Sequence, residues 1–535
     1  MNDAFSKTYE IMGAFLTYSD IYGKKPKLQE VIDDIRKIEL KKALTIISNF
    51  SLYTQEQTKE IVVSKLSSYI TNPLVLERLE STYLFDVSNL YYSMKMFIAH
   101  GTEKPFYEFN NSFGDHMNIL NTILKISDLM QDDVGNDIQV QQTIQKLRLI
   151  NRENSSLVTL ARQHLFFEEI AKNQSQNNEF VDIHKYFKEE YGYTIGDYIS
   201  VLATITLVTE NEHPTFDKLE LIGIPLNYFN SLSPTKQQVA ETILNDLVAD
   251  FSLLKNQAKA SLDNIYDNEF LINKPLFVYD NHYVLFSLPL LNLGLFDSLC
   301  FKLQRICRKH KQDFFTFFGR LYEKYVEYIL DDVVKKAIDK NIPYEFIPEY
   351  KYTEGKNSSD AFIRLGNKLL IIECKGGRIT KEAKINANLK DTEKNFQKYA
   401  VEPLKQANKA YKDILIFDPN KFRGVKKVYI FSVALQRFPK LPMYHDRLKD
   451  EVTDLHPTVV EYDYMSLSDL EAIAAYIENQ NKSVFRFIDN KKIDFEYYSY
   501  EEYYARKNSI IHFLSLHKQM FDKSTDQIIS TFRSQ

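Results

Sequence analysis

The first half of the chain carries apolar residues at three- and four-residue spacing, which is the pattern of amphipathic helices. Residues 74–100 and 234–258 show this spacing over several turns. A run of polar residues that begins at Asn173 predicts a loop, with a possible subdomain break near 173–180. We therefore expect a mostly helical domain over residues 1–265.

The pattern changes from helical to β-rich spacing after this first half. Two β-rich runs within Leu276–Phe286 are separated by Asp280-Asn281-His282, which predicts a β-hairpin inside a connecting segment over residues 266–309. Residues 314–335 then place apolar side chains on one helical face. This helix opens a second domain, in which strand patterns follow.

Residues 310–481 alternate between strand and helix patterns and predict an α/β domain with a central mixed sheet. Pro348 limits the first strand to a sheet edge. The expected elements are strands at 344–352, 361–365, 368–375, 425–435 and 459–464, a helix around 396–411, and a helix that a Ser468–Glu471 capping box opens and that runs through Ile477. With a C-terminal extension at 482–535, the expected fold class is α+β overall.

The dipeptide Gly366-Asn367 lies between two β-rich runs and predicts a two-residue hairpin turn. That turn pairs Leu365 with Lys368 and, counting outward, places Asp360 opposite Glu373. The period of two puts Lys375 on the face of Glu373 and turns Cys374 to the other face. Two like charges at opposed positions destabilise a sheet, so something must offset their repulsion.

A divalent cation would offset it, because Mg²⁺ binds carboxylates, keeps several waters and binds substrate phosphates. Such an ion beside Lys375 suits phosphodiester hydrolysis, with Mn²⁺ as a substitute. The alternative is a solvated surface hairpin whose Glu373 and Lys375 form a weak ion pair. The apolar run Leu369–Ile372 favours the metal site, because unpaired charges on a buried strand are costly.

These residues resemble the PD-(D/E)XK superfamily of restriction-endonuclease-like nucleases, with Ser359-Asp360 and Glu373-Cys374-Lys375 as its two motifs. The resemblance covers about a third of the chain. It implies that Asp360, Glu373 and the Cys374 carbonyl bind Mg²⁺ and that Lys375 positions and activates water. It also implies that Glu323, in the helix before the strands, completes the metal site.

Two further residues extend the resemblance, and each has a plainer alternative. Gln406 and Tyr411 resemble a glutamine-and-tyrosine element that orients the nucleic acid strand, although their spacing is one residue longer than usual. They could equally be a helix-surface glutamine and a buried tyrosine. Glu323 has a neighbour, Glu327, four residues later, and the pair could form a solvated helix face. We expect Glu323 to face the site and Glu327 to point outward.

Charge is unevenly distributed along the chain. The net charge is −5, but residues 351–450 hold twenty-two basic and eleven acidic side chains, which makes this window +11 and the remainder −16. A basic stripe beside a metal site is typical of a polyanion binder, and we expect Arg378, Lys381 and Lys384 to contact nucleic acid. An ordinary solvated lysine-rich helix is the alternative.

Composition and absent motifs narrow the remaining classes. With 44% hydrophobic and 26% charged residues, the chain is globular, and its three scattered cysteines and first residues predict a reduced, cytoplasmic protein without a secretion signal or membrane span. No phosphate-loop, His-Glu-x-x-His or Gly-x-Ser-x-Gly motif occurs.

The expected function is a Mg²⁺-dependent DNA endonuclease, with an RNA-directed nuclease and a non-catalytic nucleic-acid-binding or helical interaction protein as alternatives. The large helical domain without chemistry of its own suggests sensing, a partner subunit or homo-oligomerisation. That architecture resembles bacterial restriction or anti-phage defence proteins, an inference by analogy.

Overall fold

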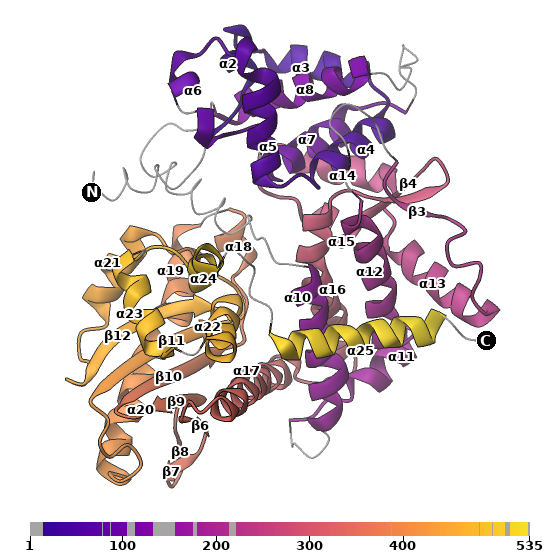
Figure 1. Ribbon diagram of the computed structural model, residues 1–535. Helices are drawn as coiled ribbons and strands as arrows, with labels where there is room; N and C mark the ends of the chain where they lie inside the picture. Colours follow the sequence, from indigo (N-terminus) through magenta and orange to yellow (C-terminus); the bar gives the residue numbers. More distant parts are fainter. Residues whose placement is uncertain are drawn as a thin grey trace. The chain divides into compact units, whose positions relative to one another are not determined.

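The computed structural model describes residues 14–77, 79–85, 87–103, 113–131, 156–174, 179–212, 214, 221–386, 388–480, 482–494, 496–508 and 514–532. They form two compact units, each assembled from separate stretches of the chain (Figure 1). The helical unit comprises Met1–Thr159, Tyr191–Lys302 and Thr525–Gln535, and the sheet unit comprises Leu160–Glu190 and Leu303–Ser524. The sequence predicted consecutive domains instead. Part of the loop predicted after Asn173, residues 175–178, lies outside the described residues.

The helical unit buries apolar faces of short helices around a common core. Its principal helices are α2 (Tyr18–Tyr22), α3 (Leu28–Arg36), α4 (Leu40–Phe50), α5 (Gln55–Ile61), α6 (Pro73–Glu77), α7 (Val87–His100), α8 (Phe113–Gln131), α12 (Ile195–Glu210), α13 (Pro234–Leu247), α14 (Phe251–Ala260) and α15 (Glu269–Asn273). Leu44, Phe97 and Ile123 are fully buried in this core. The stretch 234–258 is thus two helices, α13 and α14, and Asp250 caps the second through the amides of Ser252 and Leu253.

The predicted hairpin at Leu276–Phe286 is confirmed and lies in the helical unit. Strands β4 (Leu276–Tyr279) and β5 (His282–Leu285) pair antiparallel, and a short strand β3 (Ile224–Pro225) joins the other edge of β5. Asp280 and Asn281 have φ angles of 44° and 58°, as a two-residue turn with two left-handed residues requires.

The sheet unit is built on a five-stranded mixed sheet with the order β12-β11-β10-β9-β6. Strands β10, β11 and β12 are parallel, with β12 at one edge of the sheet, whereas β9 pairs antiparallel with both β10 and β6. Their bounds are β6 (Tyr344–Pro348), β9 (Ala361–Leu365), β10 (Lys368–Lys375), β11 (Lys427–Ala434) and β12 (Val459–Ser466). The expected α+β architecture with a mixed sheet is therefore confirmed.

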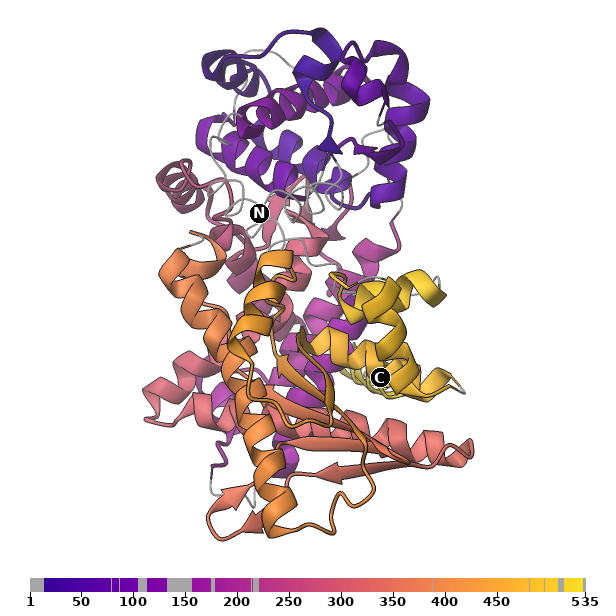
Figure 2. The ribbon, with the colours of Figure 1, turned by 90° about the vertical axis from the view of Figure 1, so that its left-hand side faces the viewer.

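Helices cover both faces of this sheet, as Figures 1 and 2 show. The helices around the sheet are α17 (Phe314–Asp339), α18 (Lys381–Lys384), α19 (Leu389–Phe396), the π-helix η6 (Gln397–Val401), α20 (Glu402–Phe417), α21 (Pro442–Glu451), α22 (Leu467–Asn479), α23 (Val484–Asp494), α24 (Tyr500–Asn508) and α25 (Ser515–Phe532). The hydroxyl of Ser432 in β11 donates to the carbonyl of Tyr399 in η6 at 2.7 Å. On α17, the Tyr322 hydroxyl donates to the Val433 carbonyl at 3.2 Å. The sheet is thus buried from both sides, which explains its continuous apolar strands.

Two local expectations for this unit are wrong: the extent of the first strand and the position of the capping box. The single strand at 344–352 ends at Pro348, whose nitrogen has no hydrogen to continue a ladder, and β7 (Lys351–Thr353) pairs with β8 (Lys356–Asn357) instead. Between β11 and β12 lies a further helix, α21, which Pro442 opens. The parallel pairing of β11 and β12 needs such a crossover.

The capping box of α22 lies two residues earlier than predicted. Ser466 and Asp469 cap each other's backbone, because the Asp469 carboxylate accepts from the Ser466 amide at 2.9 Å while Ser466 caps the Asp469 amide. Glu471, predicted as the capping carboxylate, is fully buried in the sheet unit.

Glu471 is the centre of a buried polar group that we call the Glu471 cluster, formed by Arg162, Tyr325, Glu471 and His517. Arg162 donates to both Glu471 oxygens, at 3.0 and 2.6 Å, and the Tyr325 hydroxyl donates to Oε1 at 2.7 Å. His517 Nε2 lies 3.1 Å from the Tyr325 hydroxyl. The cluster ties the segment Leu160–Glu190 and the C-terminal helix α25 to the sheet's own helices α17 and α22.

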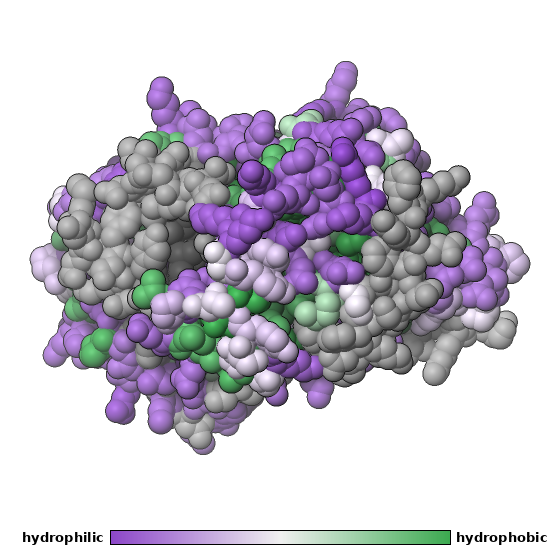
Figure 3. Space-filling view, turned by 90° about the horizontal axis from the view of Figure 1, so that it is seen from above, coloured by the Kyte–Doolittle hydropathy of each residue, from purple (hydrophilic) through white to green (hydrophobic). Residues whose placement is uncertain are grey.

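The surface has the usual mixture of polar and apolar residues. On the face drawn in Figure 3, hydrophilic residues occupy most of the coloured surface, with hydrophobic ones between them. Among the described helices, none is both long and apolar enough to cross a lipid bilayer.

Candidate metal centre

The β9–β10 hairpin positions the two motif carboxylates as the sequence predicts. The turn at Gly366-Asn367 has Gly366 at a φ of 59°, the conformation that a glycine at the first position of such a turn supplies. Leu365 pairs with Lys368, and the ladder runs outward to Ala361 opposite Ile372. The next position on each side is Asp360 and Glu373. The hairpin register predicted from the sequence is thus confirmed.

Asp360 is fixed by the backbone of the neighbouring strand. Its Oδ2 accepts a hydrogen bond from the Cys374 amide at 2.6 Å. The Cys374 side chain is buried and lies against Tyr322 of α17, where burial raises the pKa of the thiol well above its usual range. Cys374 therefore faces away from Glu373 and Lys375, as the strand alternation predicts.

Glu373 and Lys375 form an ion pair at the end of β10, on the face that α20 covers. Lys375 Nζ lies 3.1 Å from Glu373 Oε1 and donates to Gln406 Oε1 on α20 at 3.2 Å. Glu373 is only 3% exposed, whereas the Lys375 side chain is 28% exposed. The ammonium group is thus held by two acceptors while it remains accessible from outside.

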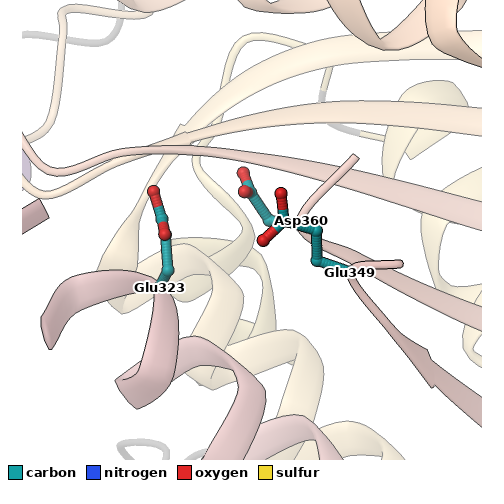
Figure 4. Close-up of side chains that lie close together, drawn as sticks. All are labelled: Glu323, Glu349 and Asp360. Atoms are coloured by element: carbon teal, nitrogen blue, oxygen red, sulfur yellow. The ribbon is translucent and has the colours of Figure 1, made fainter. Parts of the chain in front are cut away.

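Three carboxylates gather beside this pair, and we call them the acidic cluster: Glu323, Glu349 and Asp360. One oxygen of each lies within 4.8 Å of the others. Figure 4 shows the three side chains close together: Glu323 comes from α17, Glu349 directly follows β6 and Asp360 directly precedes β9. This is the geometry of a site that could hold a cation with oxygen ligands.

Glu349 is the member that the sequence analysis missed. It follows Pro348, which pairs with Ala361 on β9, so the next position along β6 brings Glu349 beside Asp360. A prediction of the β6–β9 register would have found it. Glu373, which the resemblance places among the metal ligands, lies next to Asp360 and forms an ion pair with Lys375.

Burial and mutual repulsion act on these carboxyl groups together. Burial and the nearby charges of Glu373 and Glu323 raise the pKa of Asp360 well above its ordinary value of 3.8. Burial also raises the pKa of Glu373 and that of Glu323, against the lowering effects of Lys375 and Arg320. In the folded protein without a bound cation, protonation of these carboxyl groups is therefore favoured.

This leads to a prediction about pH. Because the folded-state pKa values of Asp360, Glu373 and Glu323 are raised, their contribution to stability is complete below the ordinary carboxyl range of about 4 to 4.5 and is lost as pH rises through the raised values. Binding of Mg²⁺ requires the deprotonated forms and should release protons. Calorimetric titrations with Mg²⁺ in buffers of different ionisation enthalpy measure that release. Asp360→Asn should reduce it, and an unchanged release in this variant would contradict the assignment.

The remaining motif residues divide into those near the site and one away from it. Gln406 reaches Lys375, but Tyr411 is buried, with its hydroxyl 3.4 Å from Thr458 Oγ1 and its ring against Phe422. Five residues along a helix correspond to about 140° of rotation, so Gln406 and Tyr411 lie on different faces of α20. The structure thus places Tyr411 in the core and not beside Lys375.

Glu323 and Glu327 have different partners, although their side chains are similarly exposed, at 29% and 35%. Glu323 belongs to the acidic cluster, whereas Glu327 accepts from Lys324 at 2.5 Å. Glu323 therefore faces the site, as expected, and Glu327 forms an ion pair with its neighbour on the helix.

The predicted nucleic-acid contacts follow β10 directly. The backbone here passes closely between helices, because a Cβ at Gly377 would lie 2.5 Å from the Tyr399 hydroxyl, and that hydroxyl donates to the Arg378 carbonyl at 2.7 Å. Lys381 and Lys384 form the ends of α18, with Lys381 exposed and Lys384 half-buried. These three basic residues thus emerge on the loop and helix next to Lys375.

Comparisons of the chain with protein-family models, with curated proteins and with solved structures give no match. The function of the protein is therefore inferred from the geometry of the site.

Proposed function

We propose that this protein is a metal-dependent nuclease that hydrolyses phosphodiester bonds, with DNA as its substrate and a restriction-endonuclease-like catalytic fold over residues 310–481. One observation carries the proposal: the acidic cluster lies beside the ion pair of the buried Glu373 with the partly exposed Lys375, at the end of β10. A structural ion pair alone would not need three further carboxylates next to it.

The donor set fits Mg²⁺ or Mn²⁺. All the side-chain donors of Glu323, Glu349 and Asp360 are carboxylate oxygens, which hard divalent cations prefer. Burial raises the pKa of Asp360, as does repulsion by Glu373 and Glu323, and a bound cation would relieve that repulsion. When bound there, the ion would lower the pKa of a bound water and polarise the phosphodiester.

The protein's own residues supply orientation and charge. The Cys374 amide fixes the Asp360 carboxylate, and Glu373 and Gln406 hold the Lys375 ammonium group at the end of β10. An ammonium group in this position can donate a hydrogen bond to an attacking water and stabilise charge that develops on a phosphate oxygen. Lys375 therefore has the role of positioning residue for water and electrostatic stabiliser for phosphate.

The basic window supports a polyanionic substrate, although part of its charge is neutralised. Lys412 and Lys440 pair with Asp454 and Asp463, which lie outside residues 351–450. Exposed lysines remain along α19, η6 and α20, namely Lys390, Lys394, Lys398, Lys405 and Lys409. They follow the face that also presents Gln406, next to Lys375, as a phosphate backbone contact would require.

The proposal is tested by incubating the full-length chain with linear, circular and single-stranded DNA and with RNA. Mg²⁺ and Mn²⁺ are supplied in parallel, and a chelator serves as control. We expect cleavage of DNA, including circular DNA, that the chelator abolishes. Cleavage of RNA alone would favour the RNA-directed alternative, and salt-sensitive binding without cleavage would favour a non-catalytic binder. Neither binding nor cleavage would contradict all three.

A further inference from the structure

Arg320 contacts the acidic cluster from one turn before Glu323 on α17. Its Nη1 donates to Glu323 Oε2 at 2.7 Å and lies 3.7 Å from Glu349 Oε2. The same side chain donates through Nε to Glu179 Oε2 at 2.9 Å. One guanidinium group thus joins two members of the acidic cluster to a carboxylate outside it.

Glu179 lies 141 positions before Arg320 in the chain. It belongs to the segment Leu160–Glu190, which is part of the same unit as Arg320. The segment is anchored there by the stack of Phe166 on Tyr325, with ring centroids 4.2 Å apart, and by Arg162 in the Glu471 cluster. Glu179 is therefore a carboxylate that a separate stretch of chain brings to the edge of the site.

We propose that Arg320 is the internal counter-ion of the acidic cluster. When a divalent cation binds the cluster and displaces the Arg320 guanidinium group, Glu179 holds that group, and Glu179 thereby sets the metal affinity. This rests on the proposed metal site. A cation shared by Glu323, Glu349 and Asp360 repels the Arg320 Nη1 group, which contacts the carboxylates of Glu323 and Glu349. The guanidinium has five N–H donors and already binds Glu179 through Nε, so it can leave Glu323 without losing every charged partner.

The exchange makes opposite predictions for the two partners. Without Glu179, Arg320 has a poorer alternative to Glu323 and Glu349 and competes more strongly with the metal. Without Arg320, the competitor is gone. Glu179→Gln should therefore weaken Mg²⁺ binding, and Arg320→Gln should tighten it. Because Glu179 acts through Arg320, the double variant should behave as Arg320→Gln alone.

The experiment is a set of calorimetric titrations of the full-length protein with Mg²⁺ and, separately, Mn²⁺. We expect a loss of about 5- to 20-fold in affinity for Glu179→Gln, within the usual range of couplings between sites. Glu327→Gln removes a carboxylate one turn from Glu323 that pairs with Lys324, and it controls for a general loss of negative charge. That variant should change the affinity less than about twofold.

Three results would overturn the inference: wild-type affinity in Glu179→Gln, an equal loss in Glu327→Gln, or additive effects in the double variant. If Arg320→Gln abolishes the cooperative melting transition, Arg320→Lys replaces it. One ammonium group cannot hold Glu179 and Glu323 through separate arms, so the effect of Glu179→Gln should shrink in that background. Metal binding with the expected couplings but without cleavage would reject the nuclease proposal and keep this one. Cleavage with additive couplings would do the reverse.

Discussion

Asp360→Asn and Lys375→Ala should each lower the rate of phosphodiester cleavage by about three orders of magnitude, the usual cost of removing a group that positions water or stabilises transition-state charge. Asp360 is a half-buried member of the acidic cluster, and the Cys374 amide holds its carboxylate in place. Lys375 is a partly exposed ammonium group whose positive charge acts on Asp360. Initial rates on circular DNA at saturating Mg²⁺ measure the effect.

Stability separates a functional role from a structural one in this experiment. Asp360→Asn keeps the size of the side chain and removes a carboxylate that Glu373 and Glu323 repel, so the metal-free variant should be at least as stable as wild type near neutral pH. A purely structural Asp360 would instead lose stability together with activity. Lys324→Ala, which removes an exposed lysine paired with Glu327, is the control that should cleave normally. Full activity in both site variants would reject the site.

Arg162→Met should produce the largest loss of stability, because it leaves the Glu471 charge buried without its main partner. Arg162 and Glu471 are 8% and 0% exposed, and breaking one side of such a pair costs about 3–5 kcal/mol. Urea unfolding reports the change. It is best followed by far-ultraviolet circular dichroism, since the chain contains no tryptophan for fluorescence.

The double variant Arg162→Met with Glu471→Met should recover much of that loss, because a buried pair replaced by apolar side chains of similar size is often close to neutral. The Tyr325 hydroxyl loses its acceptor in this variant, and His517 loses the nearby carboxylate, so recovery should be incomplete. The matched control is the exposed pair of Lys335 with Asp331, for which Lys335→Met should cost less than about 1 kcal/mol. An Arg162→Met variant no weaker than this control would show that the Glu471 cluster is not a structural anchor.

Local chemistry allowed the hairpin to be predicted, because a two-residue turn fixes strand register without knowledge of the rest of the fold. Gly366-Asn367 thereby gave the neighbourhood of Asp360 and Glu373. Glu349 could not be found in this way. Its position depends on the pairing of β6 with β9, and the separate β7–β8 hairpin lies between these two strands in the chain. Local patterns do not encode such a register.

Other differences have equally physical causes. The Ser468–Glu471 pattern satisfied the spacing of a capping box, but the fold buries Glu471 against Arg162, a residue 309 positions earlier. The role of Arg320 depends in the same way on Glu179. Both contacts join stretches of chain whose proximity no period of two or 3.6 can indicate. Sequence patterns thus located the strands of the site, and tertiary packing determined which charges surround it.

The discontinuous sheet unit also has a consequence for the time course of synthesis. Arg162 leaves the ribosome 309 residues before Glu471, an interval of roughly 15 to 60 s at about 5–20 residues per second. For about the first half of that interval Phe166 lacks its stacking partner Tyr325 of α17, and until the end of it Arg162 lacks Glu471 of α22. The nascent chain must therefore keep this segment from premature association until the last third of the protein has been made. The rate of translation across residues 160–480 is thus a factor in the yield of folded protein.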